Sequence, residues 1–112
     1  MESRPRKIRF YRDAHGRNHF DEWFQALEDR ASQQRINQRL DRLVRGLFGD
    51  SRNLPGGIRE LRLDFGPGYR LYFGEDGTVV VVLVIGGDKQ SQSRDIVFAQ
   101  AAWADYLRRS QR

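Results

Sequence analysis

Four stretches of the chain carry the hydrophobic pattern of β-strands: 8–11, 58–65, 69–73 and 79–85. In the first three, apolar and polar residues alternate, so each strand has one apolar face. The last is an unbroken apolar run rich in β-branched residues, which is typical of a strand buried on both faces. Turn formers at 66–68 and 75–77 predict that the last three strands form an antiparallel meander.

Three other stretches have apolar residues at helical spacing. Asn18 is a typical N-cap residue and precedes a stripe that contains Phe20 and Trp23. Ser32 is the expected cap of a second helix, which ends at Gly46 and Gly49 and carries a row of arginines opposite its apolar stripe. A third helix is expected to begin near Ser91 or Ser93, with Trp103 on its apolar side. Both tryptophans are therefore expected in the core.

The intervening segment 50–57 contains a Pro-Gly-Gly sequence and is predicted to be a loop. The resulting order, β-α-α-β-β-β-α, predicts an α+β fold with a mainly antiparallel sheet and its helices packed on one face. We expect one domain over residues 1–112, because a chain of 112 residues supports a single core. The sheet face left bare by the helices is the expected place for a functional site.

Charge adds a class of partner to this fold. The chain has 20 Lys and Arg against 15 Asp and Glu, a net charge of +5, and only Lys7 and Lys89 are lysines. Arginine forms bidentate contacts with phosphate, so the composition fits a nucleic-acid partner, and it fits a solvated basic surface equally well. There are no cysteines and no long apolar run, which predicts a cytoplasmic protein without disulfides, thiolate metal sites or a membrane partner.

Strand alternation predicts where these cations gather. Arg62 and Arg70 should share the bare face with Tyr72, and Lys89 follows the next strand. Cations beside an aromatic ring on a rigid sheet suit a phosphodiester and a stacked base. The competing interpretation is a lattice of ion pairs in which Glu60 and Asp64 neutralise the two arginines.

Other chemistry is poorly represented in the sequence. His15 and His19 have no carboxylate that completes a metal-binding motif, and residues 86–89 lack the spacing of a phosphate-binding loop. We therefore expect no metal and no small-molecule cofactor.

The run ELRLDFGPGYRLYF, followed by VVVVLVIGGDKQSQSRDI, resembles the RelE/ParE toxin superfamily. It is similar in particular to the HigB-like branch, whose members are often described as addiction module killer proteins. The resemblance spans nearly the whole chain, and its most specific parts are GPGYRLYF and GGDKxxQxRDI. It implies a RelE/ParE-like fold and the toxin of a type II toxin-antitoxin system.

The resemblance also implies roles for individual residues. Arg70 corresponds to the arginine that binds the phosphate under attack, Arg62 to a basic residue of the preceding strand, and Lys89 to a residue that neutralises charge or protonates the leaving group. These three are the expected catalytic residues. Tyr72, Arg59 and Arg94 are the expected RNA-binding residues.

Two departures from the pattern leave the activity open. The Tyr or His expected near the start of the last helix has no counterpart, and a strand position that is often basic in the family is Glu60 here. Only Asp88 or Asp95 therefore remains as a guess for the general base. The leading hypothesis is a metal-independent, ribosome-dependent endoribonuclease that cuts messenger RNA and is held inactive by a cognate antitoxin, a helix-turn-helix protein. The alternatives are a ParE-like DNA gyrase inhibitor without nuclease activity and a non-enzymatic nucleic-acid-binding module.

Overall fold

The structure, a computed structural model, describes residues 6–110 and contains five strands and three helices. In chain order these are β1 (Lys7–Phe10), α1 (His19–Ala26), α2 (Arg30–Val44), β2 (Ser51–Leu54), β3 (Ile58–Arg62), β4 (Arg70–Asp76), β5 (Val79–Gly86) and α3 (Gln92–Ser110). The α+β class is thus confirmed. Within residues 6–110 no helix is long and apolar enough to cross a membrane.

The strands form one mixed sheet in the order β1-β5-β4-β3-β2. Strands β2 to β5 are antiparallel neighbours, whereas β1 lies parallel to β5 at the edge. The central strand β5 is buried on both faces as predicted, with Val80 through Leu83 fully inaccessible. β1 pairs only with Val79–Val82, so the last part of β5 extends beyond it.

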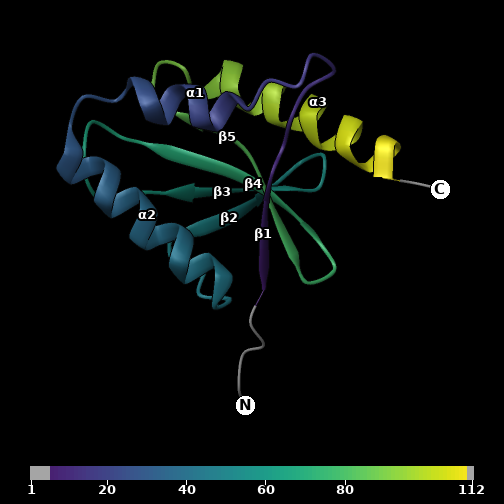
Figure 1. Cartoon of the computed structure of the whole chain (residues 1–112), viewed down its shortest axis with the longest axis horizontal. Coiled ribbons are helices and arrows are strands. Elements are labelled where there is room, and N and C mark those ends of the chain that lie inside the picture. Colours follow the sequence, from purple (N-terminus) through teal and green to yellow (C-terminus); the bar gives the residue numbers. More distant parts are fainter. Residues whose placement is uncertain (1–5, 111–112) are drawn as a thin grey trace.

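Helices cover both faces of the sheet, which corrects the prediction that they pack on one. Phe20 of α1 and Ile36 of α2 pack with Leu71 on one face, whereas Ala99 and Trp103 of α3 pack on the other. Figure 1 shows α2 and α3 on opposite sides of the strands. An amphipathic stripe specifies that a helix packs against the sheet but does not specify the face. The site must therefore lie where α3 leaves the second face uncovered.

Two local predictions were also wrong. Residues 51–54, expected in a loop, form the edge strand β2, because Ser51–Leu54 pairs with β3 in register. The second helix is capped by Asp29 rather than Ser32, since the Asp29 carboxylate accepts hydrogen bonds from the backbone N–H groups of Ala31 and Ser32. The prediction for Asn18 is confirmed, because its side chain accepts from the N–H of Asp21 at 3.0 Å.

Candidate functional site

A pocket of about 400 Å³ lies on the α3 face of the sheet, just beyond the first turn of α3. We call it the cationic pocket; it is lined by Asp50, Arg52, Glu60, Arg62, Arg70, Lys89 and Gln92. All three residues expected to be catalytic line it, although they come from β3, β4 and the loop after β5. Four cationic side chains face two carboxylates, so the pocket has an excess of positive charge.

Arg70 has no carboxylate partner among residues 6–110. Its Nη1 donates to the backbone carbonyl of Gly68 at 2.9 Å, and its Nε is buried without a hydrogen-bond partner. A buried donor that lacks a partner is costly unless a ligand supplies the acceptor. This guanidinium is therefore held in place by the turn before β4 and is free to receive an anion.

Arg62 and Lys89 complete the group of cations. Arg62 lies directly opposite Arg70 in the β3–β4 register, and its Nε donates to Asp50 Oδ2 at 3.1 Å. Both side chains of that ion pair are more than half exposed, so the pair is weak and an anionic ligand can compete for Arg62. Lys89 is exposed and forms no ion pair within the described residues. The pocket thus offers three cations for one ligand.

Glu60 is the buried carboxylate under this pocket, with a fully inaccessible side chain. It accepts hydrogen bonds from Arg52 Nε at 2.8 Å, from the Tyr72 hydroxyl at 2.9 Å and from Gln92 Nε2 at 3.0 Å. Burial acts to raise the pKa of Glu60, but the hydrogen bonds from Gln92, Arg52 and Tyr72 outweigh it and hold the pKa below its ordinary value. Glu60 therefore stays ionised and ties β2, β4 and α3 together.

This arrangement corrects the expectation that Tyr72 stacks a base. Its side chain is completely buried, because α3 covers it, and its hydroxyl is used by Glu60. Burial, together with the Glu60 hydrogen bond, raises the pKa of Tyr72 well above its ordinary value. Tyr72 is a structural support beneath the pocket and cannot contact RNA in this fold.

The ion-pair lattice predicted as the competing interpretation is only partly present. Glu60 binds Arg52 instead of Arg62 or Arg70. Asp64 lies 3.8 Å from Arg35 and 3.9 Å from Arg39, both on α2, and is not part of the pocket. Arg70 consequently keeps its charge without compensation.

Arg59 lies on the other face of the sheet. It is opposite Phe73, which belongs to the core under α1 and α2, and its guanidinium lies over the Phe48 ring and donates to Asn53 and Ser51. This placement corrects the expectation that Arg59 joins the RNA-binding group, because alternation puts its side chain away from Arg62 and Arg70.

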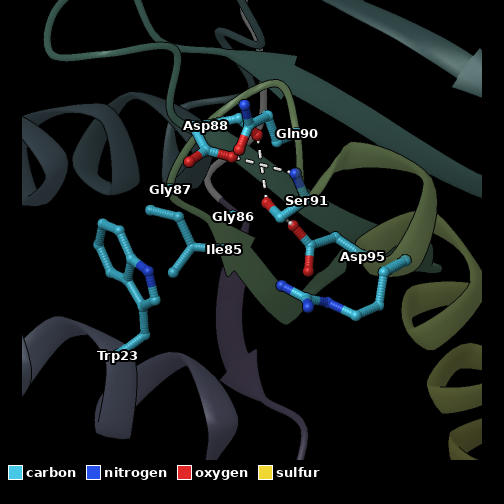
Figure 2. Close-up of a pocket in the computed structure, with 9 residues that line it drawn as sticks. Trp23, Ile85, Gly86, Gly87, Asp88, Gln90, Ser91 and Asp95 are labelled. Atoms are coloured by element: carbon cyan, nitrogen blue, oxygen red, sulfur yellow. Dashed lines mark hydrogen bonds between the residues drawn. The ribbon is translucent and has the colours of Figure 1, made fainter.

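A second pocket, of about 490 Å³, lies on the other side of the start of α3. We call it the tryptophan pocket; it is lined by Trp23, Ile85, Gly86, Gly87, Asp88, Gln90, Ser91, Arg94 and Asp95 (Figure 2). It contains Arg94, expected to bind RNA, and also Asp88 and Asp95, the two guesses for the general base. Neither carboxylate lines the cationic pocket.

Three residues of the cationic pocket, Asp50, Arg52 and Gln92, were missed by sequence reasoning. Arg52 was overlooked because its segment was taken as a loop, although β2 places it directly opposite Glu60. Gln92 lies in the QSQSRD segment and bonds Glu60 from α3, which was expected on the other face. The only signal for Arg52 was the unpaired Glu60 on the neighbouring strand. Within residues 6–110, no group of three or more His, Asp or Glu side chains is placed to hold a metal ion.

Comparison with known proteins adds one relative. No family model matches the chain, and no solved structure matches it. An uncharacterized protein of Haemophilus influenzae is 44% identical over 77 residues, which cover 69% of this chain and 78% of that protein. The chain belongs to the same family as this Haemophilus protein.

Proposed function

We propose that the protein is the toxin of a type II toxin-antitoxin system, with the RelE/ParE fold, and that it cleaves messenger RNA at the ribosome without a metal ion. The observation that carries the proposal is the cationic pocket, where Arg62, Arg70 and Lys89 meet and Arg70 has no carboxylate partner among the described residues. The RelE/ParE-like motifs in the sequence support the same conclusion. Because the proposed target is messenger RNA at the ribosome, we also propose that the protein acts in the cytoplasm.

The reaction suits a pocket with an excess of positive charge. The ribose 2′-hydroxyl releases its proton to solvent water, its oxygen attacks the adjacent 3′-phosphorus, and the 5′-oxygen of the next nucleotide leaves, which gives a 2′,3′-cyclic phosphate and a 5′-hydroxyl. Arg70 and Arg62 donate to the non-bridging oxygens as charge builds on them, and Lys89 supplies the proton to the leaving oxygen. Rigid positioning on two paired strands lowers the entropic part of the barrier.

Neither carboxylate that lines the cationic pocket is free to act as the general base. Both oxygens of Glu60 already accept hydrogen bonds, and Asp50 is paired with Arg62. The nuclease would therefore have to work mainly by orientation and charge stabilisation. The same observation favours the second candidate, a ParE-like gyrase inhibitor that needs no base because it acts by binding protein alone. A non-enzymatic nucleic-acid-binding module is the third.

Induction of the wild type and of Arg70→Ala in bacterial cells separates these candidates. We expect the wild type to arrest growth and to produce new RNA 5′ ends within translated messages, and the variant to cleave about 100-fold more slowly. Cleavage is measured by sequencing RNA 5′ ends after induction. Arg45→Ala is the matched control, because Arg45 is the exposed C-cap residue of α2 and lines neither pocket.

Each other outcome contradicts the proposal in a different way. Growth arrest with intact messages and altered plasmid supercoiling supports the gyrase inhibitor. Absence of arrest, together with salt-sensitive RNA binding, supports the binding module. Unchanged toxicity in Arg70→Ala removes the cationic pocket from any of these activities.

The proposed antitoxin is a helix-turn-helix protein encoded next to this chain. An acidic segment of such a partner would bind the excess positive charge of the cationic pocket and block it, since charge complementarity speeds association. Co-expression with the adjacent small reading frame should restore growth and yield a complex that survives purification. A gene with no small neighbour would contradict this part of the proposal.

A further inference from the structure

The tryptophan pocket has a flat aromatic wall. Trp23, on α1, is partly buried, and its ring meets Tyr69 edge-on, with 5.3 Å between the ring centroids and an interplanar angle of 85°. This contact holds the ring in place, with its Nε1 edge next to Gly87 of the pocket. Aromatic faces held in this way are surfaces on which nucleobases stack.

A carboxylate stands across the end of β5 from this wall. Asp95 Oδ2 accepts from the Ser91 hydroxyl at 2.6 Å, and Figure 2 shows Asp95 on the other side of Gly86 from Trp23. A Cβ at Gly86 would overlap Asp95 Oδ2, so the glycine allows the carboxylate to lie against the strand. Asp95 Oδ1 accepts no hydrogen bond from residues 6–110 and is free for a ligand.

The pocket has two other charged residues: Asp88 stabilises the turn before α3, and Arg94 is available to a ligand. Asp88 Oδ1 accepts from the backbone N–H of Ser91 at 3.0 Å and so serves the turn before α3. Arg94 is exposed, and its guanidinium forms no hydrogen bond or ion pair with the described part of the chain. Among the described residues, one oxygen each of Asp88 and Asp95 and the Arg94 guanidinium therefore remain unoccupied in the pocket.

These groups match one nucleobase better than the others. Guanine presents N1–H as a donor to the free Asp95 Oδ1 and O6 as an acceptor for the Arg94 guanidinium, which together make a two-point contact. Adenine presents the N1 acceptor to the carboxylate and the N6 donor to the arginine, so both contacts would be repulsive. A separate cation, such as a partner's arginine side chain, would be attracted by Asp88 and Asp95 but repelled by Arg94.

We propose that the tryptophan pocket binds a guanine base, stacked on Trp23 and read by Asp95 and Arg94. The inference rests on the proposed RNA substrate and specifies part of it. Lys89 lines the cationic pocket, whereas its neighbours Asp88 and Gln90 line the tryptophan pocket. The two pockets thus share one loop, so a guanosine can place its base in one pocket and its phosphate in the other.

Binding of single nucleotides to the purified chain tests this directly, since it requires neither a ribosome nor cleavage. We expect guanosine 5′-monophosphate to bind about tenfold more tightly than adenosine 5′-monophosphate, in line with the discrimination of a good bidentate contact. Asp95→Asn, which keeps the shape of the side chain, should remove this preference. Affinities are measured by calorimetry, and quenching of tryptophan fluorescence that is lost in Trp23→Leu reports the stacking.

Asp105→Asn is the matched control, because Asp105 is another hydrogen-bonded carboxylate of α3 that lies outside both pockets. It should keep the guanine preference. Equal affinity for the two nucleotides, an unchanged ratio in Asp95→Asn, or competition by N-acetylarginine amide with no binding of guanosine monophosphate would each overturn the inference. Cleavage that depends on Arg70 without a guanine preference leaves the proposed function standing and rejects only this inference.

Discussion

At the scale of single residues, the site depends on a division of labour between two kinds of charged group. Glu60 is buried and both of its oxygens accept hydrogen bonds, so its charge is compensated within the fold. Arg70, one strand pair away, has no carboxylate within the described residues and keeps its charge for a ligand. A stable anion site requires a cation that is left free, here Arg70. It also requires a fixed surrounding structure, which the ionised Glu60 carboxylate provides by holding its neighbours.

Replacement of Glu60 tests the first half of this division. In Glu60→Gln one amide oxygen must serve three donors, so at least one buried donor loses its partner. We expect the free energy of unfolding at neutral pH to fall by about 2 kcal/mol. Chemical denaturation measures it, and Glu28→Gln, at an exposed position, is the control that should change little.

The same variant predicts a pH dependence. The pKa of Glu60 in the fold lies below the ordinary value of 4.5, so its charge stabilises the fold fully above that value, and this contribution is lost as the pH falls through the folded-state pKa. The difference in unfolding free energy between wild type and Glu60→Gln should therefore shrink as the pH is lowered below about 4.5. Denaturation series at several pH values check it; a difference that grows on acidification would contradict the assigned pKa direction.

At the scale of elements, α3 determines what remains of the second sheet face. Trp103 packs so closely on β4 that a Cβ at Gly74 would overlap its ring. The first residue of α3, Gln92, then reaches Glu60 at the edge of the cationic pocket. The helix thus closes most of the face and also forms one wall of the opening that is left.

Substitution at Gly74 should displace this helix. In Gly74→Ala the new methyl group must push Trp103 away, and we expect a loss of stability of about 2 kcal/mol, typical of overpacking. Gly87→Ala is the control, because its Cβ would make only ordinary contact with Trp23 Nε1 at 3.6 Å. Thermal unfolding followed by tryptophan fluorescence compares the two, and equal stability would show that α3 packs less tightly than described.

The elements also show how far the sequence could be interpreted. Alternation correctly put Arg62 and Arg70 on one face, because side-chain direction in a strand depends only on local geometry. Strand β2 was missed because Ser51, Arg52 and Asn53 are polar, and an edge strand is held by its partner more than by its own pattern. The burial of Tyr72 could not be derived either, since it depends on which face α3 covers.

At the scale of the whole molecule, local charge matters more than the net charge of +5. The molecule measures 40 × 38 × 24 Å, whereas salt screens charges beyond about 8 Å under physiological conditions. Charges on the far side therefore contribute little at the cationic pocket. Arg62, Arg70 and Lys89 must supply most of the attraction for a phosphate backbone.

The salt dependence of RNA binding measures this contribution. For a short single-stranded RNA, each lost phosphate contact reduces the slope of log affinity against log salt by about 0.7. The double variant Arg62→Ala with Lys89→Ala should therefore lower the slope by about 1.4. Titrations over a range of potassium chloride concentrations measure the slope, Arg45→Ala should leave it unchanged, and an unaltered slope in the double variant would place the phosphate elsewhere.

The parallel pairing of β1 with β5 has a consequence for synthesis of the chain. The first strand finds its neighbour only after residue 79 has been made, and the wall formed by Lys89 and Gln92 follows later still. A nascent polypeptide that ends before residue 79 has neither the complete five-stranded sheet nor the anion site. The activity proposed here therefore cannot exist before residue 92 has been added to the chain.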